Sequence, residues 1–286
     1  MTTQANIAYG LPDTRHRTIT WICVAVLLAL RLPYLTGMPL ILGSEPEWLD
    51  PSFQVTTYAI IAFLIWWEHK SLPTFNIDGL AIAIIVLFKP VQTIILALWG
   101  RTGWSSFPQP GSLVILVIAI GLAVVLWKAH PTTIAFSWKS LGWFGMGSVL
   151  GIILSTAVSL FMIAFLKSPV PPNPGSTALL APFYQLGYAA VDEEPLFRAF
   201  LWGALLRSGW RNLWIWLLTA VLFTSGHLHL LNTPNPVVNL MIIFGFALAA
   251  GGLAWRLKGI TASLGFHAFW NGSPLIIYAV STILFK

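Results

Sequence analysis

One stretch of the sequence places four charged side chains inside a long apolar run: Val191-Asp192-Glu193-Glu194-Pro195-Leu196-Phe197-Arg198. Its three consecutive acids stand inside a long apolar run, and no other acidic residue occurs between Asp78 and Lys286. An ionisable side chain at membrane depth is expensive, by about 2.5–3.5 kcal/mol on insertion scales. Adjacent carboxylates in such a place need a compensating reason, and catalysis is the first to consider.

The composition predicts an integral membrane protein. Hydrophobic residues make up 57% of the 286 residues and charged residues only 8%, and the mean hydropathy is +0.80. A soluble globular domain carries about 25% charged residues. The net charge of +6 comes from basic residues scattered singly between apolar runs, which argues against a nucleic-acid surface. The single cysteine, Cys23, allows neither a disulfide framework nor a cysteine metal site within one chain.

The apolar runs predict an all-α fold, a polytopic transmembrane helical bundle of 8–9 spans, because each run is too long for a core strand. The candidate helices cover residues 18–42, 52–67, 79–99, 111–127, 141–166, 179–206, 213–230, 237–255 and 260–283. Arg31 and Pro33 interrupt the first run and the second run is short, so eight spans is the alternative to nine. A polar segment at 1–17 therefore precedes five transmembrane helices within 18–166.

The basic residues predict how the bundle is oriented. With the N-terminus inside and the spans threaded alternately, nine basic residues fall in inner loops: Arg15, Arg17, Lys70, Lys128, Lys139, Arg207, Arg211, Arg256 and Lys258. Three fall on the outer side: Arg101, Lys167 and Lys286. This asymmetry follows the positive-inside rule and predicts a cytoplasmic N-terminus. The compact chain, without long soluble extensions, favours a bacterial plasma membrane.

The three remaining basic residues lie within spans. Arg31 is expected to snorkel outward, and Lys89 to snorkel or to bond carbonyls that Pro90 leaves free. Arg198 stands four residues after Glu194, so the two share a helix face and can pair. Glu193 points about 100° away around the helix. One glutamate is then neutralised while the other faces a cavity. A structural ion pair would explain Glu194 and Arg198 alone, but it leaves Glu193 unexplained.

Two later helices add polar groups at a similar depth. One ends in Phe223-Thr224-Ser225-Gly226-His227, and the last carries His267 and Asn271 one turn apart. A single intramembrane histidine usually makes an interhelical hydrogen bond. At a rise of about 1.5 Å per residue, however, Glu193 and all three of these residues fall near the middle of the bilayer and can meet.

The meeting residues suit hydrolysis of an acyl bond in a water-filled cavity. A glutamate shielded from bulk water can act as a general base on water, and a neutral histidine can help to hold that water. A histidine–asparagine pair offers donors to a developing oxyanion. No serine or cysteine stands out as a nucleophile. Asp192 is expected to be a wetted cavity residue. His229, about 200° from His227 on a helical wheel, is expected to face another helix or the membrane interface.

The motifs Glu193-Glu194-x-x-x-Arg198, Phe223-x-x-x-His227 and His267-x-x-x-Asn271 resemble, in order and on separate helices, those of the CAAX prenyl protease type II family, also called CPBP or Abi. The resemblance covers about residues 179–283. One departure is Ala199, where many relatives have glycine after the arginine. The resemblance implies an intramembrane endopeptidase, and it implies that the fold is a helical bundle around a polar cavity. Its substrate would be a peptide or the C-terminal tail of a membrane-associated protein, prenylated or not.

The resemblance also implies a role for each matching position. Glu193 would activate water with the help of His227, His267 and Asn271 would stabilise the oxyanion, and Glu194 and Arg198 would orient the site. Family members are often named metalloproteases, and Glu193, His227 and His267 could form a zinc site. We favour a metal-free reaction without a cofactor, with zinc as the alternative.

A non-enzymatic membrane protein is the other class to weigh. Buried Glu, His and Arg residues are also the parts of proton relays in transporters. No internal repeat is visible, although many transporters have one. A scaffold or immunity protein could keep an intact polar core without turnover. The residues upstream on the motif helix, Tyr184, Gln185 and Tyr188, could line a cavity or pack in the core.

Overall fold

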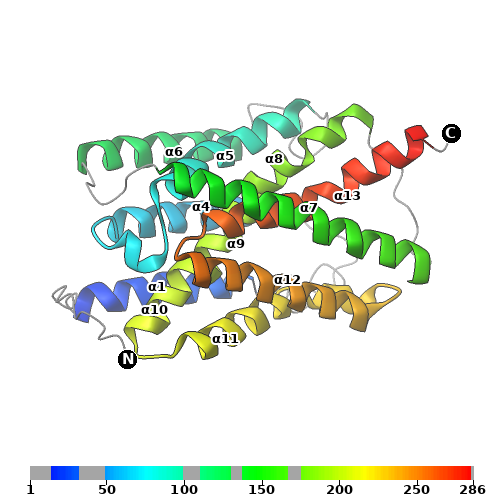
Figure 1. Cartoon of the computed structure of the whole chain (residues 1–286). Helices are drawn as coiled ribbons and strands as arrows, with labels where there is room; N and C mark the ends of the chain where they lie inside the picture. Colours follow the sequence, from blue (N-terminus) through cyan, green and yellow to red (C-terminus); the bar gives the residue numbers. More distant parts are fainter. Residues whose placement is uncertain (1–13, 32–48, 99–109, 130–136, 167–174, 285–286) are drawn as a thin grey trace.

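The computed structural model describes residues 14–31, 49–98, 110–129, 137–166 and 175–284. Within these ranges the ordered elements are helices and no strand occurs, which confirms the predicted all-α fold. In the first half the helices are α1 (Thr14–Ala29), α4 (Leu49–Trp67), η1 (Leu72–Phe75), α5 (Gly79–Leu98), α6 (Pro110–Ala129) and α7 (Trp138–Leu166). The long helices run roughly side by side along one direction of the molecule (Figure 1).

In the second half, the acidic stretch lies in one continuous helical run whose winding changes. Its parts are η2 (Gly175–Leu180), α8 (Ala181–Gln185), η3 (Leu186–Ala190), α9 (Val191–Glu194), η4 (Pro195–Phe200) and α10 (Leu201–Arg207). η3 and η4 are π-helical, and η4 begins at Pro195, which has no N–H to continue the regular hydrogen-bond ladder. Short π-helical stretches inside α-helices are frequent at functional sites. The three acids stand between two of them.

The remaining helices are α11 (Asn212–Ser225), η5 (Leu228–Asn232), α12 (Pro236–Leu257) and α13 (Thr261–Leu284). Each predicted helix overlaps helical structure, but the C-terminal ends of two predicted helices lie well beyond the observed ones. The first predicted helix, 18–42, is described only as far as the turn after α1, and residues 32–48 lie outside the described part of the chain. The predicted helix 213–230 already ends at Ser225, where the chain enters a turn before η5.

Among the described residues, three helices are long and apolar enough to cross a membrane: Gly111–Ala129, Trp138–Leu166 and Pro236–Leu257. Two shorter apolar helices cover Gly79–Gln92 and Asn212–Ser225. These helices support an integral membrane protein. The count of 8–9 spans and the cytoplasmic N-terminus stay predictions.

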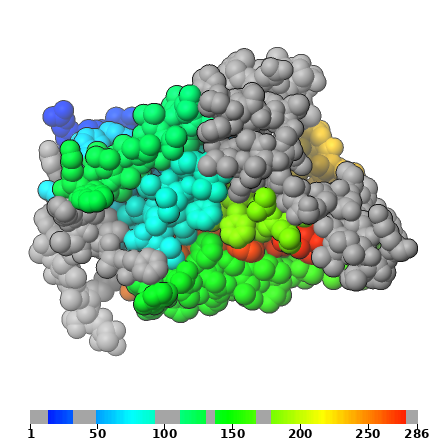
Figure 2. Space-filling model, turned by 90° about the horizontal axis from the view of Figure 1, so that it is seen from above, coloured from blue at the N-terminus to red at the C-terminus, as the bar shows by residue number. Residues whose placement is uncertain are grey.

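Close backbone packing fixes α13, the helix that carries two of the predicted site residues. A Cβ at Gly151 of α7 would lie 2.5 Å from the carbonyl oxygen of Phe266, so only glycine allows the two helices to approach this closely. Ser155 of α7 donates a hydrogen bond to the Trp270 carbonyl at 2.8 Å. Small residues at helix contacts are the usual means of close packing in membranes. Viewed at 90°, part of the run that begins at η2 is visible at the surface between α5 and α13 (Figure 2).

A cluster of hydrogen bonds around Glu68 connects α1, the turn after α4 and the end of α10. Its Oε1 accepts hydrogen bonds from Thr20 Oγ1 at 2.6 Å and Arg207 Nη1 at 3.1 Å, and its Oε2 accepts one from Ser71 Oγ at 2.5 Å. His16 Nε2 lies 3.4 Å from Oε2. The side chain of Glu68 is fully buried. This carboxylate therefore ties the start of α1 and the end of α10 to the turn that follows α4.

Candidate active site

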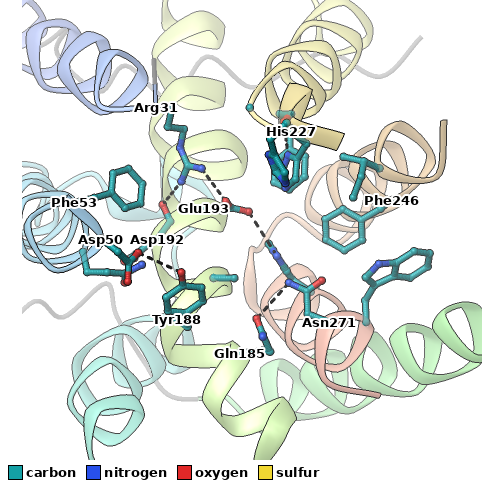
Figure 3. Close-up of a pocket in the computed structure, with 18 residues that line it drawn as sticks. Arg31, Asp50, Phe53, Gln185, Tyr188, Asp192, Glu193, His227, Phe246 and Asn271 are labelled. Carbon is teal, nitrogen blue, oxygen red and sulfur yellow. Dashed lines mark hydrogen bonds and ion pairs between the residues drawn. The ribbon is translucent and has the colours of Figure 1, made fainter. Parts of the chain in front are cut away.

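A cavity of about 690 Å³ lies among the helices (Figure 3). Its apolar lining includes Phe53, Phe223, Ile243, Phe246 and Trp270. Its polar and charged lining comprises Arg31, Asp50, Gln54, Gln185, Tyr188, Asp192, Glu193, His227, His229, His267 and Asn271. The four residues predicted to meet at one depth, Glu193, His227, His267 and Asn271, therefore all face the same space.

Glu193 on α9 reaches the cavity and keeps 14% of its side chain exposed. Its Oε1 lies 2.7 Å from Arg31 Nη1, and its Oε2 lies 3.6 Å from His267 Nε2. Each carboxylate oxygen thus has one charged or ionisable neighbour on a different helix or turn. The remaining access of Glu193 is to the cavity, where a water molecule or a substrate carbonyl would be placed.

Glu194 points away from the cavity and organises the groups behind it. Its side chain is fully buried, and Oε1 lies 2.7 Å from His267 Nδ1 and 3.4 Å from Arg198 Nη1. Arg198 also donates to the Ala247 carbonyl at 3.5 Å and lies over the Phe223 ring at 4.4 Å. The predicted pairing of Glu194 with Arg198 is therefore present. Glu194 also contacts Nδ1 of His267, and the other ring nitrogen, Nε2, faces Glu193.

His227 stands in the turn directly after α11. Its Nδ1 lies 2.9 Å from the Phe223 carbonyl oxygen, and because that oxygen can only accept, Nδ1 is the donor. In the neutral ring Nε2 is then an acceptor, able to take a hydrogen bond from water. The stacking of His227 on Phe223, with ring centroids 4.9 Å apart, fixes the plane of the ring.

Asn271 lies one turn after His267 on α13 and also lines the cavity. Its Nδ2 donates a long hydrogen bond of 3.5 Å to Gln185 Oε1. An amide nitrogen carries two N–H groups, so one remains for a substrate oxygen. Gln185 and Tyr188, which the sequence left open between cavity and core, are both part of the lining.

The three consecutive acids each have a cation of their own. Asp192 Oδ2 lies 2.5 Å from Lys89 Nζ on α5, and Lys89 also donates to Gln54 on α4. Glu193 pairs with Arg31, and Glu194 with Arg198. The expectation that Lys89 snorkels or bonds free carbonyls was wrong, because its ammonium is fully buried against these two side chains. Asp192 touches the cavity but is 1% exposed, so it is an ion-pair partner rather than a wetted residue.

Arg31 corrects a second expectation. It does not snorkel outward: it is 9% exposed and turns inward from the turn after α1 toward Glu193 (Figure 3). The inward position of Arg31 could have been predicted from the equal numbers of acidic and basic residues within the predicted spans. The chain has three basic residues inside predicted spans, Arg31, Lys89 and Arg198, and three acids at one point of another span. Charges at membrane depth usually pair with one another.

His229 corrects a third expectation. It lines the same cavity as His227, with ring centroids 5.8 Å apart, instead of facing another helix. The angle of about 200° assumed a helix continuing through both residues. Since α11 ends at Ser225, the helical wheel does not apply to this pair.

The arrangement fits zinc poorly. A zinc site would have to draw on Glu193, His227 and His267, but Arg31 already holds one oxygen of Glu193 at 2.7 Å, and a guanidinium beside a metal ligand opposes a second cation. Within the described residues, no three His, Cys, Asp or Glu side chains are placed to hold a metal ion. The cavity brings together a carboxylate, imidazole rings and an amide, groups that can donate and accept hydrogen bonds.

Comparison with known proteins identifies one family. Residues 175–273 match the family described as type II CAAX prenyl endopeptidase Rce1-like. The match includes all three motifs and confirms the predicted resemblance. It covers 99 of the 286 residues and leaves out Arg31, Gln54 and Lys89. No curated protein and no solved structure matches the chain.

Proposed function

Residues 175–273 match the type II CAAX prenyl endopeptidase Rce1-like family, and on that premise we propose that the protein is an intramembrane endopeptidase whose general base is Glu193. The observation that carries the proposal is the position of Glu193, His227, His267 and Asn271 around one cavity. The substrate is a peptide bond in a membrane-associated or lipidated protein or peptide. The aromatic side of the cavity suits an apolar side chain or a lipid group.

The reaction begins with a water molecule between Glu193 and His227. Glu193 takes one proton of this water, while Nε2 of His227 accepts a hydrogen bond from the other. The water oxygen bonds to the carbonyl carbon, and the negative charge passes from the carboxylate to the carbonyl oxygen. The carbon–nitrogen bond then breaks, and Glu193 returns the proton to the leaving amine.

The oxyanion is stabilised by the α13 side of the cavity. Asn271 donates the N–H that Gln185 does not use. His267 donates the Nε2–H of its ring to the oxyanion, while its Nδ1 stays in contact with Glu194. Glu194 and Arg198 hold that ring in place without touching the substrate. We propose no metal or other cofactor in these steps, and the contact of the Arg31 guanidinium with Glu193 Oε1 supports this choice.

The test is proteolysis by purified protein in detergent of quenched fluorescent peptides, some prenylated and some unmodified. Wild type, Glu193→Gln and EDTA-treated wild type are compared. Cleavage that is lost in the variant and survives EDTA supports the metal-free glutamate reaction. Loss with EDTA and recovery with zinc would replace it with a metalloenzyme. Cleavage by Glu193→Gln would overturn the assignment, and no cleavage of the panel by wild type would favour a scaffold.

A further inference from the structure

Arg31 is a charged residue at the cavity that belongs to neither the family match nor the three motifs. It lies two residues after the end of α1, and 162 residues separate it from Glu193 in sequence. Its Nη1 donates to Glu193 Oε1 at 2.7 Å, and its Nη2 donates to the Asp192 carbonyl at 3.4 Å. The two donors of one guanidinium thus contact the side chain of one residue and the backbone of the residue before it.

The guanidinium lies over two aromatic rings. Its central carbon lies 5.6 Å from the centroid of Phe53 and 5.3 Å from that of Phe197. Cations are attracted to the faces of aromatic rings, and the planar fork of arginine fixes the direction of its hydrogen bonds. Arg31 is therefore held by residues of α4 and η4, and it fixes one oxygen of the Glu193 carboxylate in turn.

We propose that Arg31 is a positioning residue for Glu193, supplied to the site by the N-terminal part of the chain. The inference rests on the proposed role of Glu193 as general base. With Oε1 held by Arg31, Oε2 is the oxygen that takes the proton from water. No proton leaves Arg31 during the reaction. Its positive charge stays next to the group from which negative charge moves to the oxyanion, so it keeps the carboxylate ionised and directed at the cavity before each turnover.

A lysine cannot replace this arrangement fully. Its ammonium lacks the planar fork that reaches Glu193 and the Asp192 carbonyl together, and it does not stack between two rings. Arg31→Lys should therefore keep the charge and lose much of the orientation. Arg31→Ala should lose both, and it leaves a space next to the cavity in which a free guanidinium ion could bind.

The chain offers a matched control in Arg207. This arginine also pairs with a buried glutamate from another helix, Glu68, at 3.1 Å, and it lies over the Phe75 ring at 4.0 Å. It lies outside the cavity. A loss of activity that follows only from a broken arginine–glutamate pair, and hence from poorer folding, should appear in Arg207→Ala as well.

The experiment measures kcat and KM for wild type, Arg31→Ala, Arg31→Lys, Arg207→Ala and Glu193→Gln in the same detergent, at non-denaturing guanidinium concentrations. We expect Arg31→Ala to lose about 10²-fold in kcat, as misplaced catalytic groups do, with a smaller change in KM. Guanidinium should restore part of that loss, and Arg31→Lys should lie between Arg31→Ala and wild type. Arg207→Ala should keep its kcat and gain nothing from guanidinium.

Two results would overturn the inference. If Arg31→Ala has the kcat of wild type while Glu193→Gln is inactive, Arg31 does not position Glu193. The proposed function is then still supported. An equal loss in Arg31→Ala and Arg207→Ala, without rescue, would reduce Arg31 to a structural residue. Activity in Glu193→Gln would instead refute the proposed function. If Arg31→Ala does not fold, Arg31→Gln takes its place, with normal kcat again overturning the inference.

Discussion

Two glutamates shielded from bulk water each pair with an arginine from another part of the chain, Glu68 with Arg207 and Glu193 with Arg31. The carboxylate of Glu68 is fully buried, and hydroxyl and guanidinium donors occupy both of its oxygens. Among the described residues, Glu193 has a single close partner on each oxygen, and it keeps 14% of its side chain exposed to a cavity. The first carboxylate joins helix ends, and the second can still react.

The difference shows that a buried arginine–glutamate pair is not in itself a sign of catalysis. Breaking either pair leaves a charge in a poorly solvated place, so both should affect folding. Only the carboxylate that faces a cavity with acceptors and donors for water and an oxyanion should affect turnover. The following experiments separate these two kinds of carboxylate.

The largest expected contrast is between Glu193→Gln and its control Glu68→Gln. Glutamine keeps size and hydrogen bonding but removes the base, so Glu193→Gln should lose about 10²–10⁴-fold in kcat, the range of general base catalysis. Glu68→Gln should keep the kcat of the folded protein and lower its Tm. Peptide cleavage and thermal unfolding of both variants in detergent decide. Equal kcat values in the two variants would erase the distinction between the regions.

A second variant tests Glu194, which is buried in an ion pair and also contacts His267 of the proposed site. Glu194→Ala leaves Arg198 buried without its counter-charge, and breaking a buried pair costs about 3–5 kcal/mol. The same change releases Nδ1 of His267. We expect a lower Tm together with a lower kcat, measured by thermal unfolding and peptide cleavage. An unchanged Tm would contradict the ion-pair account of Glu194 and Arg198.

Asn271→Ala probes the oxyanion side of the cavity alone. Loss of one oxyanion donor should lower kcat by about 10²–10³-fold while KM changes less. Since, within the described part of the chain, Asn271 makes only a long hydrogen bond to Gln185, the Tm should stay close to that of wild type. Steady-state kinetics on one peptide checks this. A defect in KM alone would assign Asn271 to substrate binding instead.

The smallest expected effect is the acid dependence of the Glu68 cluster. Burial by itself raises the pKa of Glu68, but hydrogen bonds from Ser71 and Thr20 and the charge of Arg207 outweigh it, so the pKa lies below its usual value. An unfolded glutamate titrates near about pH 4.3. The stabilisation is therefore complete above that pH and is lost as the pH falls toward the folded pKa.

Wild type should accordingly exceed Glu68→Gln in Tm by a constant margin at neutral pH, and the margin should shrink below about pH 4.3. Thermal unfolding of both proteins over a pH series measures it. A margin that widens on acidification would mean that Glu68 is protonated in the folded protein.

The helices and the meeting of the motif residues at one cavity could be predicted from sequence because both depend on local patterns. Apolar runs broken by proline and glycine located the helices, and the four-residue spacing of Glu194 and Arg198 predicted their ion pair. The positions of His227, His267 and Asn271 along their helices predicted that they meet Glu193 at one depth. All four line the cavity. Their catalytic roles remain to be measured.

The partners of the acids could not be predicted in the same way. Spacing relates residues within a helix, whereas Lys89 meets Asp192, and Arg31 meets Glu193, across helices whose neighbours a single sequence does not specify. His229 was misplaced for another reason: an error of a few residues in the end of α11 changes which way a side chain points. The motif residues were therefore easier to find than the groups that hold them.

The pairing of the acids with distant cations also bears on how the protein is made. Lys89 precedes Asp192 by 103 residues and Arg31 precedes Glu193 by 162. At about 5–20 residues per second, each cation leaves the ribosome about 5–30 s before its carboxylate. During that interval the early helices must carry an uncompensated charge among apolar neighbours. The arrival of α9 brings Asp192 and Glu193 to these cations, so both ion pairs form only when the helix that carries the proposed general base has been made.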